Sequence, residues 1–227
     1  MNTDRKKQFC VAGVHCVCGI YLCSSVFICG STSLFCLLAG CAPPASALPT
    51  EHETIIFLRH GEKPPAGLGQ IDCQGLNRAL ALPPVLAKRY GTPAAIFAPD
   101  PAQTVQDRGI TYDYIRPLAT IEPTAIRLGL PLNASFGVRD TTALEHELLA
   151  PSYQNSTIFV AWEHRIIVTL ARDLLTQAGA DPAAVPDWPS NDFDSLYVIA
   201  ITHRGTHITA NFTHESEGLN NLPAACP

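Results

Sequence analysis

The run Ile55–Lys63, which reads Ile-Ile-Phe-Leu-Arg-His-Gly-Glu-Lys, constrains the fold more than any other stretch of the chain. Its four apolar residues predict a buried strand that ends at Arg59 and His60, with Gly61 opening the turn. Open α/β sheets bind ligands at the edge where such strands end. Arginine beside histidine is costly to bury there unless an anion accompanies them. The run therefore predicts an anion site, and phosphate is the anion that we expect.

Strand and helix patterns alternate along the rest of the chain. We expect further strands at 94–98, 157–162, 196–202 and 207–212, helices at 74–90, 117–128, 141–149 and 166–178, and loops at 100–114 and 181–191. Pro83-Pro84 predicts a kink or a split in the first helix. Alternation of this kind indicates an α/β layered domain, and the final hairpin makes its sheet mixed.

The first fifty residues carry the pattern of an export signal. No Asp, Glu, Lys or Arg occurs between Lys7 and Glu51, and a basic start precedes this apolar stretch. Leu38-Ala39-Gly40-Cys41 resembles a bacterial lipobox, in which Cys41 becomes the lipidated N-terminus. Ala45-Ser46-Ala47 offers a competing cleavage site for ordinary secretion, and an uncleaved membrane anchor is a further alternative.

These signals divide the chain into a signal peptide at 1–40 (to 47 with the competing site), a tether at 41–53 and one domain at 54–227. With either cut or with an anchor, we expect the domain outside a bacterial cytoplasm, at the periplasmic or cell-surface face. A lipid on Cys41 would hold it to a membrane.

Only two of the nine cysteines belong to the expected domain, Cys73 and Cys226. Two cysteines in an exported domain favour one disulfide, and two unpaired buried thiols are the alternative. No second Cys or His stands beside either at the spacing of zinc ligands, so we expect no metal site.

The charge balance excludes one class of partner. The chain has 15 Lys and Arg against 20 Asp and Glu, and three of the former and one of the latter lie in residues 1–40. The remainder carries a net charge of −7, which argues against nucleic acid as a partner.

Three motifs resemble those of the histidine phosphatase (phosphoglycerate mutase-like) superfamily. Arg59-His60-Gly61-Glu62 after a strand is similar to its opening signature, and Arg116-x-x-x-Thr120 followed by Glu122-Pro123 is similar to its second motif. The third is the apolar strand that ends at His164. The resemblance spans about residues 54–213 and implies a three-layer α/β/α sandwich with a mostly parallel mixed sheet.

The resemblance also implies a chemistry that needs no metal and no other cofactor. His60 would attack phosphorus and form a phosphohistidine that water later hydrolyses. Arg59, Arg116 and His164 would bind the phosphoryl oxygens. Glu62 belongs to the opening signature and is expected to orient Arg59 or another basic side chain.

The proton donor to the leaving group must be a carboxyl whose pKa is raised. Glu163 is the first choice, because a carboxylate at a buried strand end beside His164 has no evident structural partner. Asp140 is the second choice, since other relatives place their acid near that point. Either residue could instead cap a helix.

The chain departs from the family at His164, which follows Trp162-Glu163 and precedes Arg165, where most relatives carry a small residue and then Gly. It also lacks the Trp-Asn pair that mutases carry after the first signature, which favours hydrolysis over transfer. We therefore expect a phosphatase acting on phosphorylated small molecules. The alternatives are a phosphoprotein phosphatase and a lipoprotein that binds a phosphate ligand without turnover. The oligomeric state is not defined by the sequence.

Overall fold

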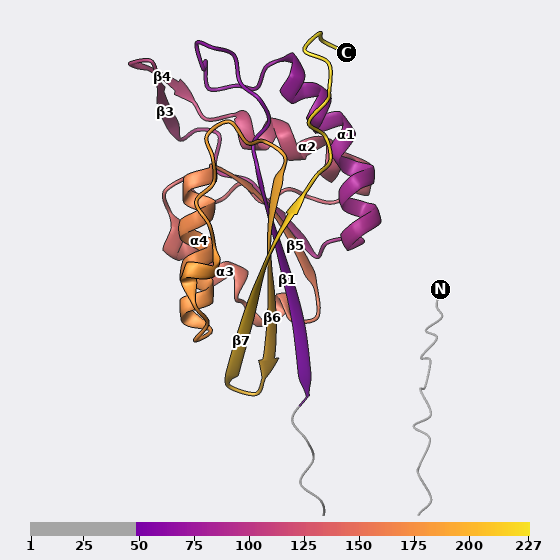
Figure 1. Cartoon of the computed structure of the whole chain (residues 1–227), viewed down its shortest axis with the longest axis vertical. Helices are drawn as coiled ribbons and strands as arrows, with labels where there is room; N and C mark the ends of the chain where they lie inside the picture. The colour runs from indigo at the N-terminus through magenta and orange to yellow at the C-terminus, as the bar shows by residue number, and fades with distance from the viewer. Residues whose placement is uncertain (1–48) are drawn as a thin grey trace, which may run out of the picture. The chain divides into compact units, whose positions relative to one another are not determined.

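The structure is a computed structural model that describes residues 49–227, so the expected signal peptide and Cys41 lie outside the described residues (Figure 1). Its elements follow one another along the chain as β1 (Thr50–Arg59), α1 (Cys73–Tyr90), β2 (Ala95–Phe97), β3 (Thr104–Asp107), β4 (Ile110–Asp113), α2 (Arg116–Leu128), α3 (Thr141–Leu148), η1 (Pro151–Tyr153), β5 (Thr157–Trp162), α4 (His164–Gln177), η2 (Pro182–Ala184), β6 (Ser195–Arg204) and β7 (His207–Ser216).

Five strands form the central sheet in the order β2-β5-β1-β6-β7. Strands β2, β5 and β1 are parallel, whereas β6 runs antiparallel to both β1 and β7. Leu58 near the end of β1 pairs with Ala161 of β5 on one side and Leu196 of β6 on the other. The last residues of β1 therefore lie in the middle of the sheet edge, as the sequence predicts.

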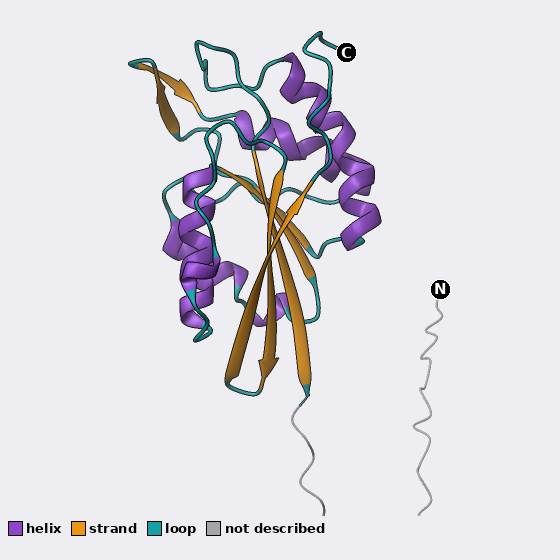
Figure 2. Ribbon diagram, viewed as in Figure 1, coloured by secondary structure: helices purple, strands orange, loops and turns teal. Residues whose placement is uncertain are grey.

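Helices cover both faces of this sheet (Figure 2). Successive residues of β1 alternate between two cores: Ile56 and Leu58 pack with α1 and α2, whereas Ile55 and Phe57 pack with α3 and α4. All four side chains are completely buried, which explains why β1 reads as a continuous apolar run. The expected three-layer α/β/α sandwich with a mixed sheet is confirmed.

The structure corrects the expectation of a loop at 100–114. Strands β3 and β4 form a separate two-stranded sheet there, joined by Arg108 and Gly109. Both of these residues have positive φ, 52° and 82°, as a type I′ hairpin turn requires. The hairpin extends above the end of the sheet at which β1 stops (Figure 1), and it supplies part of the site described below.

The structure excludes one alternative for the first helix and corrects the start of another. Helix α1 runs through Pro83 and Pro84 as one element and is not split. Helix α4 begins at His164, two residues earlier than expected, because Glu163 caps its N-terminus. No helix in residues 49–227 is long and apolar enough to cross a membrane.

Cys73 and Cys226 form a disulfide that ties the end of the chain to the start of α1. Asn77 in the first turns of α1 strengthens this connection, since its side-chain amide donates to the carbonyls of Pro223 at 2.9 Å and Ala225 at 2.7 Å. The pairing that the sequence favours over two free thiols is therefore present.

Candidate active site

His60 follows the last residue of β1 and is almost completely buried, with 2% of its surface exposed. Its Nδ1 lies 2.8 Å from the carbonyl oxygen of Gly61. A carbonyl only accepts, so Nδ1 must carry the proton, and Nε2 of the neutral ring holds a lone pair. This hydrogen bond selects the tautomer that a nucleophilic histidine needs.

The surroundings of His60 keep its ring neutral. Burial lowers its pKa to about 3, and the positive charges of Arg59, Arg116 and Lys63 act in the same direction against the hydrogen bond to Gly61. An imidazole with this pKa is unprotonated at any physiological pH. The ring is therefore neutral, with a free lone pair on Nε2, and it is set among cations.

Thr120 fastens helix α2 to the turn that carries His60. The Thr120 hydroxyl accepts from the Gly61 N–H at 2.8 Å and donates to the Arg116 carbonyl at 2.8 Å. Gly61 has no room for a side chain, because a Cβ there would lie 2.9 Å from the Cα of Gly75 in α1. The spacing Arg116-x-x-x-Thr120 thus has a structural reason, since it places an arginine one helical turn from this hydrogen bond.

Arg59 lies beside His60 but is directed toward the loop before β6. Its Nη1 donates to the carbonyls of Pro189, Ser190 and Asp192 at 3.4, 2.9 and 2.6 Å. Its guanidinium also stacks 3.9 Å above the ring of Phe193. Its buried Nε has no hydrogen-bond partner among residues 49–227. Nη1 of Arg59 is thus hydrogen-bonded to the protein, whereas its Nε remains available to a ligand.

Arg116, the first residue of α2, is held by a carboxylate from the β3–β4 hairpin. Its Nη1 donates to Asp107 Oδ2 at 2.6 Å, and the same oxygen accepts from the Gly69 N–H at 3.0 Å. Burial raises the pKa of Asp107, but Arg116, the Gly69 N–H and Lys63 outweigh it and hold that pKa below its usual value. Asp107 is a site residue that the sequence analysis missed, because it lies in the segment expected to be a loop.

Glu163 and His164 stand where β5 passes into α4. Glu163 Oε2 accepts from the N–H groups of Arg165 and Ile166 at 2.9 and 3.0 Å, which caps α4. Its Oε1 lies 2.7 Å from His164 Nδ1, without the alignment of a hydrogen bond. Burial raises the pKa of Glu163, but His164 and the two N–H groups outweigh it and lower that pKa. The premise that Glu163 lacks a structural partner is therefore wrong.

Asp140 lies at the N-cap position of α3 but does not cap it. Its Oδ2 accepts instead from the N–H of Gly137 at 2.9 Å, in its own turn. The residue is exposed. Glu163 therefore lacks the raised pKa that the proton-donor role needs, and Asp140 is exposed and hydrogen-bonded within its own turn.

A cavity of about 680 Å³ opens beside these residues. It is lined by Lys63, Thr104, Val105, Gln106, Asp107, Tyr114, Arg116, Val138, Arg139, Glu163, His164, Arg165 and Ile166. Arg59, His60 and Asp140 do not line this cavity. The Tyr114 ring lines the cavity and packs edge-on against the His60 ring, with 6.2 Å between the ring centroids, so Tyr114 lies between buried His60 and the open space.

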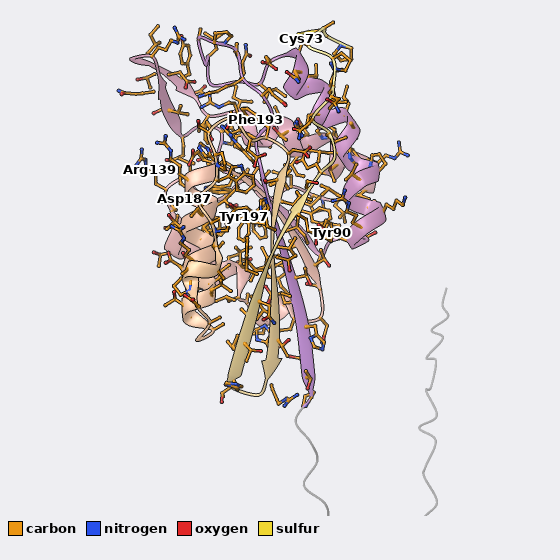
Figure 3. All side chains as sticks on the ribbon, in the orientation of Figure 1. Cys73, Tyr90, Arg139, Asp187, Phe193 and Tyr197 are labelled. Carbon is orange, nitrogen blue, oxygen red and sulfur yellow. A yellow bond between two sulfur atoms is a disulfide. The ribbon has the colours of Figure 1, made fainter. Side chains whose placement is uncertain are left out.

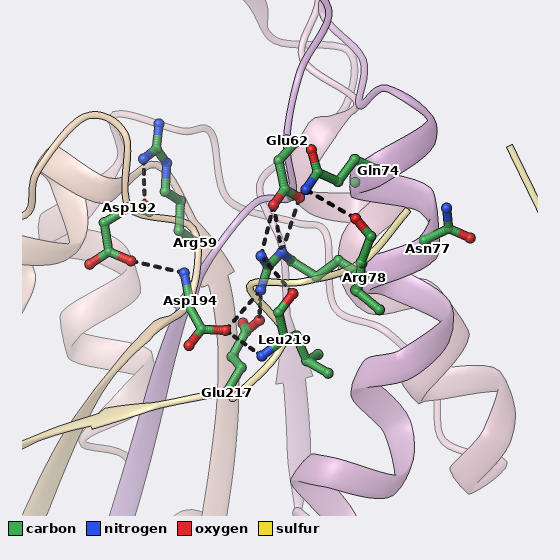
Figure 4. A network of polar contacts seen from close by, with 12 residues as sticks. Arg59, Glu62, Gln74, Asn77, Arg78, Asp192, Asp194, Glu217 and Leu219 are labelled. Carbon is green, nitrogen blue, oxygen red and sulfur yellow. Dashed lines mark hydrogen bonds and ion pairs between the residues drawn. The ribbon is translucent and has the colours of Figure 1, made fainter. Parts of the chain in front are cut away.

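Glu62 orients a basic side chain that the sequence did not reveal, Arg78 of α1 (Figure 4). Arg78 is completely buried and contacts Glu62 at 2.7 Å, Asp194 at 3.3 Å and Glu217. Glu217 follows β7, so this cluster joins the turn after His60 to the C-terminal segment. Three carboxyl groups share one guanidinium, so a single positive charge cannot balance all three in the ionised form.

The part of the chain that the structure describes contains no group of three or more His, Cys, Asp or Glu side chains able to hold a metal ion. His203 pairs with buried Glu53 at 3.2 Å. That pair lies toward the opposite end of β1, remote from His60 along the strand.

No protein-family model matches the sequence, and no curated protein sequence matches it. Among solved structures, the chain is similar to a putative phosphohistidine phosphatase SixA from Nakamurella multipartitia at 14% identity and a TM-score of 0.48, covering 72% of this chain and 95% of that one. It is also similar to a mycobacterial glucosyl-3-phosphoglycerate phosphatase bound to inorganic phosphate, at 16% identity and a TM-score of 0.48, covering 71% of this chain and 95% of that one. A third similar structure is a phosphoglycerate mutase from Plasmodium falciparum, at 13% identity and a TM-score of 0.47, covering 76% of this chain and 94% of that one. Such values are too low to transfer an activity to this chain.

Proposed function

We propose that this chain is a phosphatase that hydrolyses phosphomonoesters through a phosphohistidine on His60, without a metal ion. The observation that carries the proposal is the state of His60: a buried, neutral ring whose proton is fixed on Nδ1 by Gly61, set among Arg59, Arg116 and Lys63. Such a ring has a nucleophilic lone pair and cationic neighbours that attract a phosphoryl group.

In the proposed reaction, the lone pair of His60 Nε2 forms a bond to phosphorus as the ester P–O bond breaks and the leaving group departs with its electron pair. Arg116 and His164 from the cavity wall, with the Nε of Arg59 that is unpartnered in residues 49–227, bind the phosphoryl oxygens. The leaving group takes its proton from solvent. Water then forms a bond to phosphorus as the P–Nε2 bond breaks, which returns the electron pair to His60 and releases inorganic phosphate. For the first step, Tyr114 must allow the phosphoryl group to reach Nε2.

The role of Glu163 in this proposal differs from the one first expected. A carboxylate that caps α4 and contacts His164 has no proton to donate in the ligand-free site. The lowered pKa of Glu163 likewise indicates that its carboxyl group is ionised. We therefore assign Glu163 to positioning His164. Asp140 is exposed and bound to its own turn, so we assign it no proton transfer.

Both carboxyl groups that line the cavity, Asp107 and Glu163, have lowered pKa values, which favours a second candidate function, a phosphoprotein phosphatase acting on phosphohistidine. The nitrogen of a phosphohistidine substrate leaves as an imidazole, which is a better leaving group than an alkoxide and needs less help from an acid. A phosphorylated small molecule remains the first candidate substrate, because the cavity volume lies within the range of about 300–1,000 Å³ that is typical of small-molecule sites.

The test is phosphate release from p-nitrophenyl phosphate by the purified full chain in detergent and EDTA. Turnover that persists in EDTA and is lost in His60→Ala supports the proposal. His146→Ala is the matched control, since His146 is an exposed histidine on α3. Activity that requires an added metal, or that survives in His60→Ala, contradicts it. Phosphate binding without turnover would favour the alternative of a protein that binds a phosphate ligand without catalysis.

We further propose that the chain is exported and that Cys41 carries a lipid that holds the domain at a membrane. The disulfide between Cys73 and Cys226 supports an oxidising compartment. Mass spectrometry of the N-terminal peptide from membranes is the test, because a lipidated Cys41 and an N-terminus after Ala47 differ in sequence and mass.

A further inference from the structure

The cavity beside the candidate active site has a positively charged outer part that the proposed reaction does not use. Residues 49–227 hold twelve Lys and Arg against nineteen Asp and Glu, yet the cavity wall carries four of the former and only two of the latter. A cavity with excess positive charge on a domain with net negative charge favours an anionic ligand.

The four cations fall into two groups. Lys63 and Arg116 both face the Asp107 carboxylate, at 3.9 and 2.6 Å. Arg139 and Arg165 form no ion pair within the described part of the chain. Arg139 belongs to the turn before α3 and Arg165 to the first turn of α4, and Figure 3 shows Arg139 next to that end of α4. Two unpaired guanidinium groups thus share one wall.

A second set of hydrogen-bond donors lies in the buried, inner part of the cavity, apart from the exposed wall that carries Arg139 and Arg165. The Tyr114 hydroxyl and Arg116 Nε are buried, and neither has a hydrogen-bond partner in residues 49–227. Both residues line the cavity and lie beside His60 or Asp107. A phosphoryl group bound at these donors would leave the rest of the volume, with Arg139 and Arg165, for the remainder of the substrate.

We propose that Arg139 and Arg165 form a subsite for a second anionic group, so that the preferred substrate is a phosphomonoester that carries a carboxylate or a further phosphate on its leaving-group side. This inference rests on the proposed function for the position of the reacting phosphoryl group. Guanidinium groups suit this role because they stay charged and bind carboxylate or phosphate in a bidentate manner. Arg165, directly after His164, would thereby select substrates by their charge.

The test compares two ligands that cannot be hydrolysed and that differ only in charge, 4-carboxybenzylphosphonate and 4-carbamoylbenzylphosphonate. Their affinities for the full chain in neutral detergent are measured by isothermal titration calorimetry. We expect the carboxylate to bind about fivefold more tightly, as for one well-placed and partly exposed ion pair. The double variant Arg139→Gln/Arg165→Gln should reduce this ratio to about one. Arg127→Gln, which removes an exposed arginine at the end of α2, should retain it.

Equal affinities in the wild type, or a preference that the double variant retains, would overturn the subsite and leave the phosphatase proposal standing. A preference that depends on the two arginines, in a protein that does not turn over p-nitrophenyl phosphate, would support the subsite and refute catalysis. Failure to bind either phosphonate would refute both. A thermal melt of the double variant, expected to match the wild type because both side chains are exposed, excludes unfolding as the cause.

Discussion

Replacing Glu217 by glutamine should stabilise the protein at alkaline pH relative to the wild type. The Glu217 side chain is completely buried and shares Arg78 with Glu62 and Asp194. Its Oε1 is buried and meets no hydrogen-bond donor in the described chain. Burial raises the pKa of Glu217 to about 8; Arg78 opposes this increase, and Asp194 and Glu62 add to it. One carboxyl of the three therefore keeps its proton through neutral pH.

The sign and size of the effect follow from proton linkage. The unfolded chain loses this proton near pH 4.5 and the folded chain near pH 8, so the folded state binds more protons in between. Stability from this group is complete below pH 4.5 and is lost as the pH rises through 8. The slope is at most about 1.4 kcal/mol per pH unit, which gives a ceiling of about 5 kcal/mol over the window. Glutamine keeps the shape and has no proton to lose.

Urea unfolding followed by circular dichroism between pH 5 and pH 9 measures this effect. We expect the stability of Glu217→Gln minus that of the wild type to increase by at least about 2 kcal/mol across the range, a conservative fraction of the ceiling. The exposed Glu122→Gln on α2 should follow the wild type in parallel. Glu53, whose pKa burial also raises to about 8, is present in every protein compared and cancels in the difference. A difference that does not change with pH would refute the reasoning.

Three further predictions concern the site and its support. Thr120→Val leaves the buried Gly61 N–H without an acceptor, so urea unfolding should show a loss of about 1–3 kcal/mol, and an unchanged midpoint would contradict the assigned hydrogen bond. Cys73→Ser should cost up to about 5 kcal/mol, because the cross-link to Cys226 spans 153 residues, and reduction of the wild type should match it; a variant as stable as the oxidised wild type would contradict this. With Glu163 ionised, wild-type turnover should be about 100-fold faster on p-nitrophenyl phosphate than on glycerol 2-phosphate, and comparable rates would reveal a proton donor.

The central layer of this fold could be predicted because its signals are local. The apolar runs Ile55–Leu58 and Ile158–Trp162 each end at the correct edge, since burial on both faces of the sheet selects a continuous apolar run at these positions. The β3–β4 hairpin could not be predicted in the same way. Its strands are four residues long and mostly exposed, so no apolar alternation marks them, and Asp107 was missed with them.

Some residues of the candidate site could be selected from the sequence, but most of their contacts could not. Arg78 lies in a helical pattern where arginine is usually solvated, and its partners Asp194 and Glu217 are 116 and 139 residues away. Long-range contacts of this kind leave no spacing to detect. The partners of Glu163 are different, because a carboxylate directly before an amphipathic helix is a recognisable N-cap signal. That signal was available and outweighs the expectation of a free acid.

The most direct test of the central claim is to look for phosphate on His60 itself. The full chain is mixed with p-nitrophenyl phosphate in EDTA, quenched in alkali within the first turnovers, and digested for mass spectrometry. The proposal predicts one added phosphoryl group on the peptide that contains His60, labile to acid and absent from His60→Ala. Steady turnover with that peptide unmodified at every quench time, or a phosphoryl group on another residue, would contradict it.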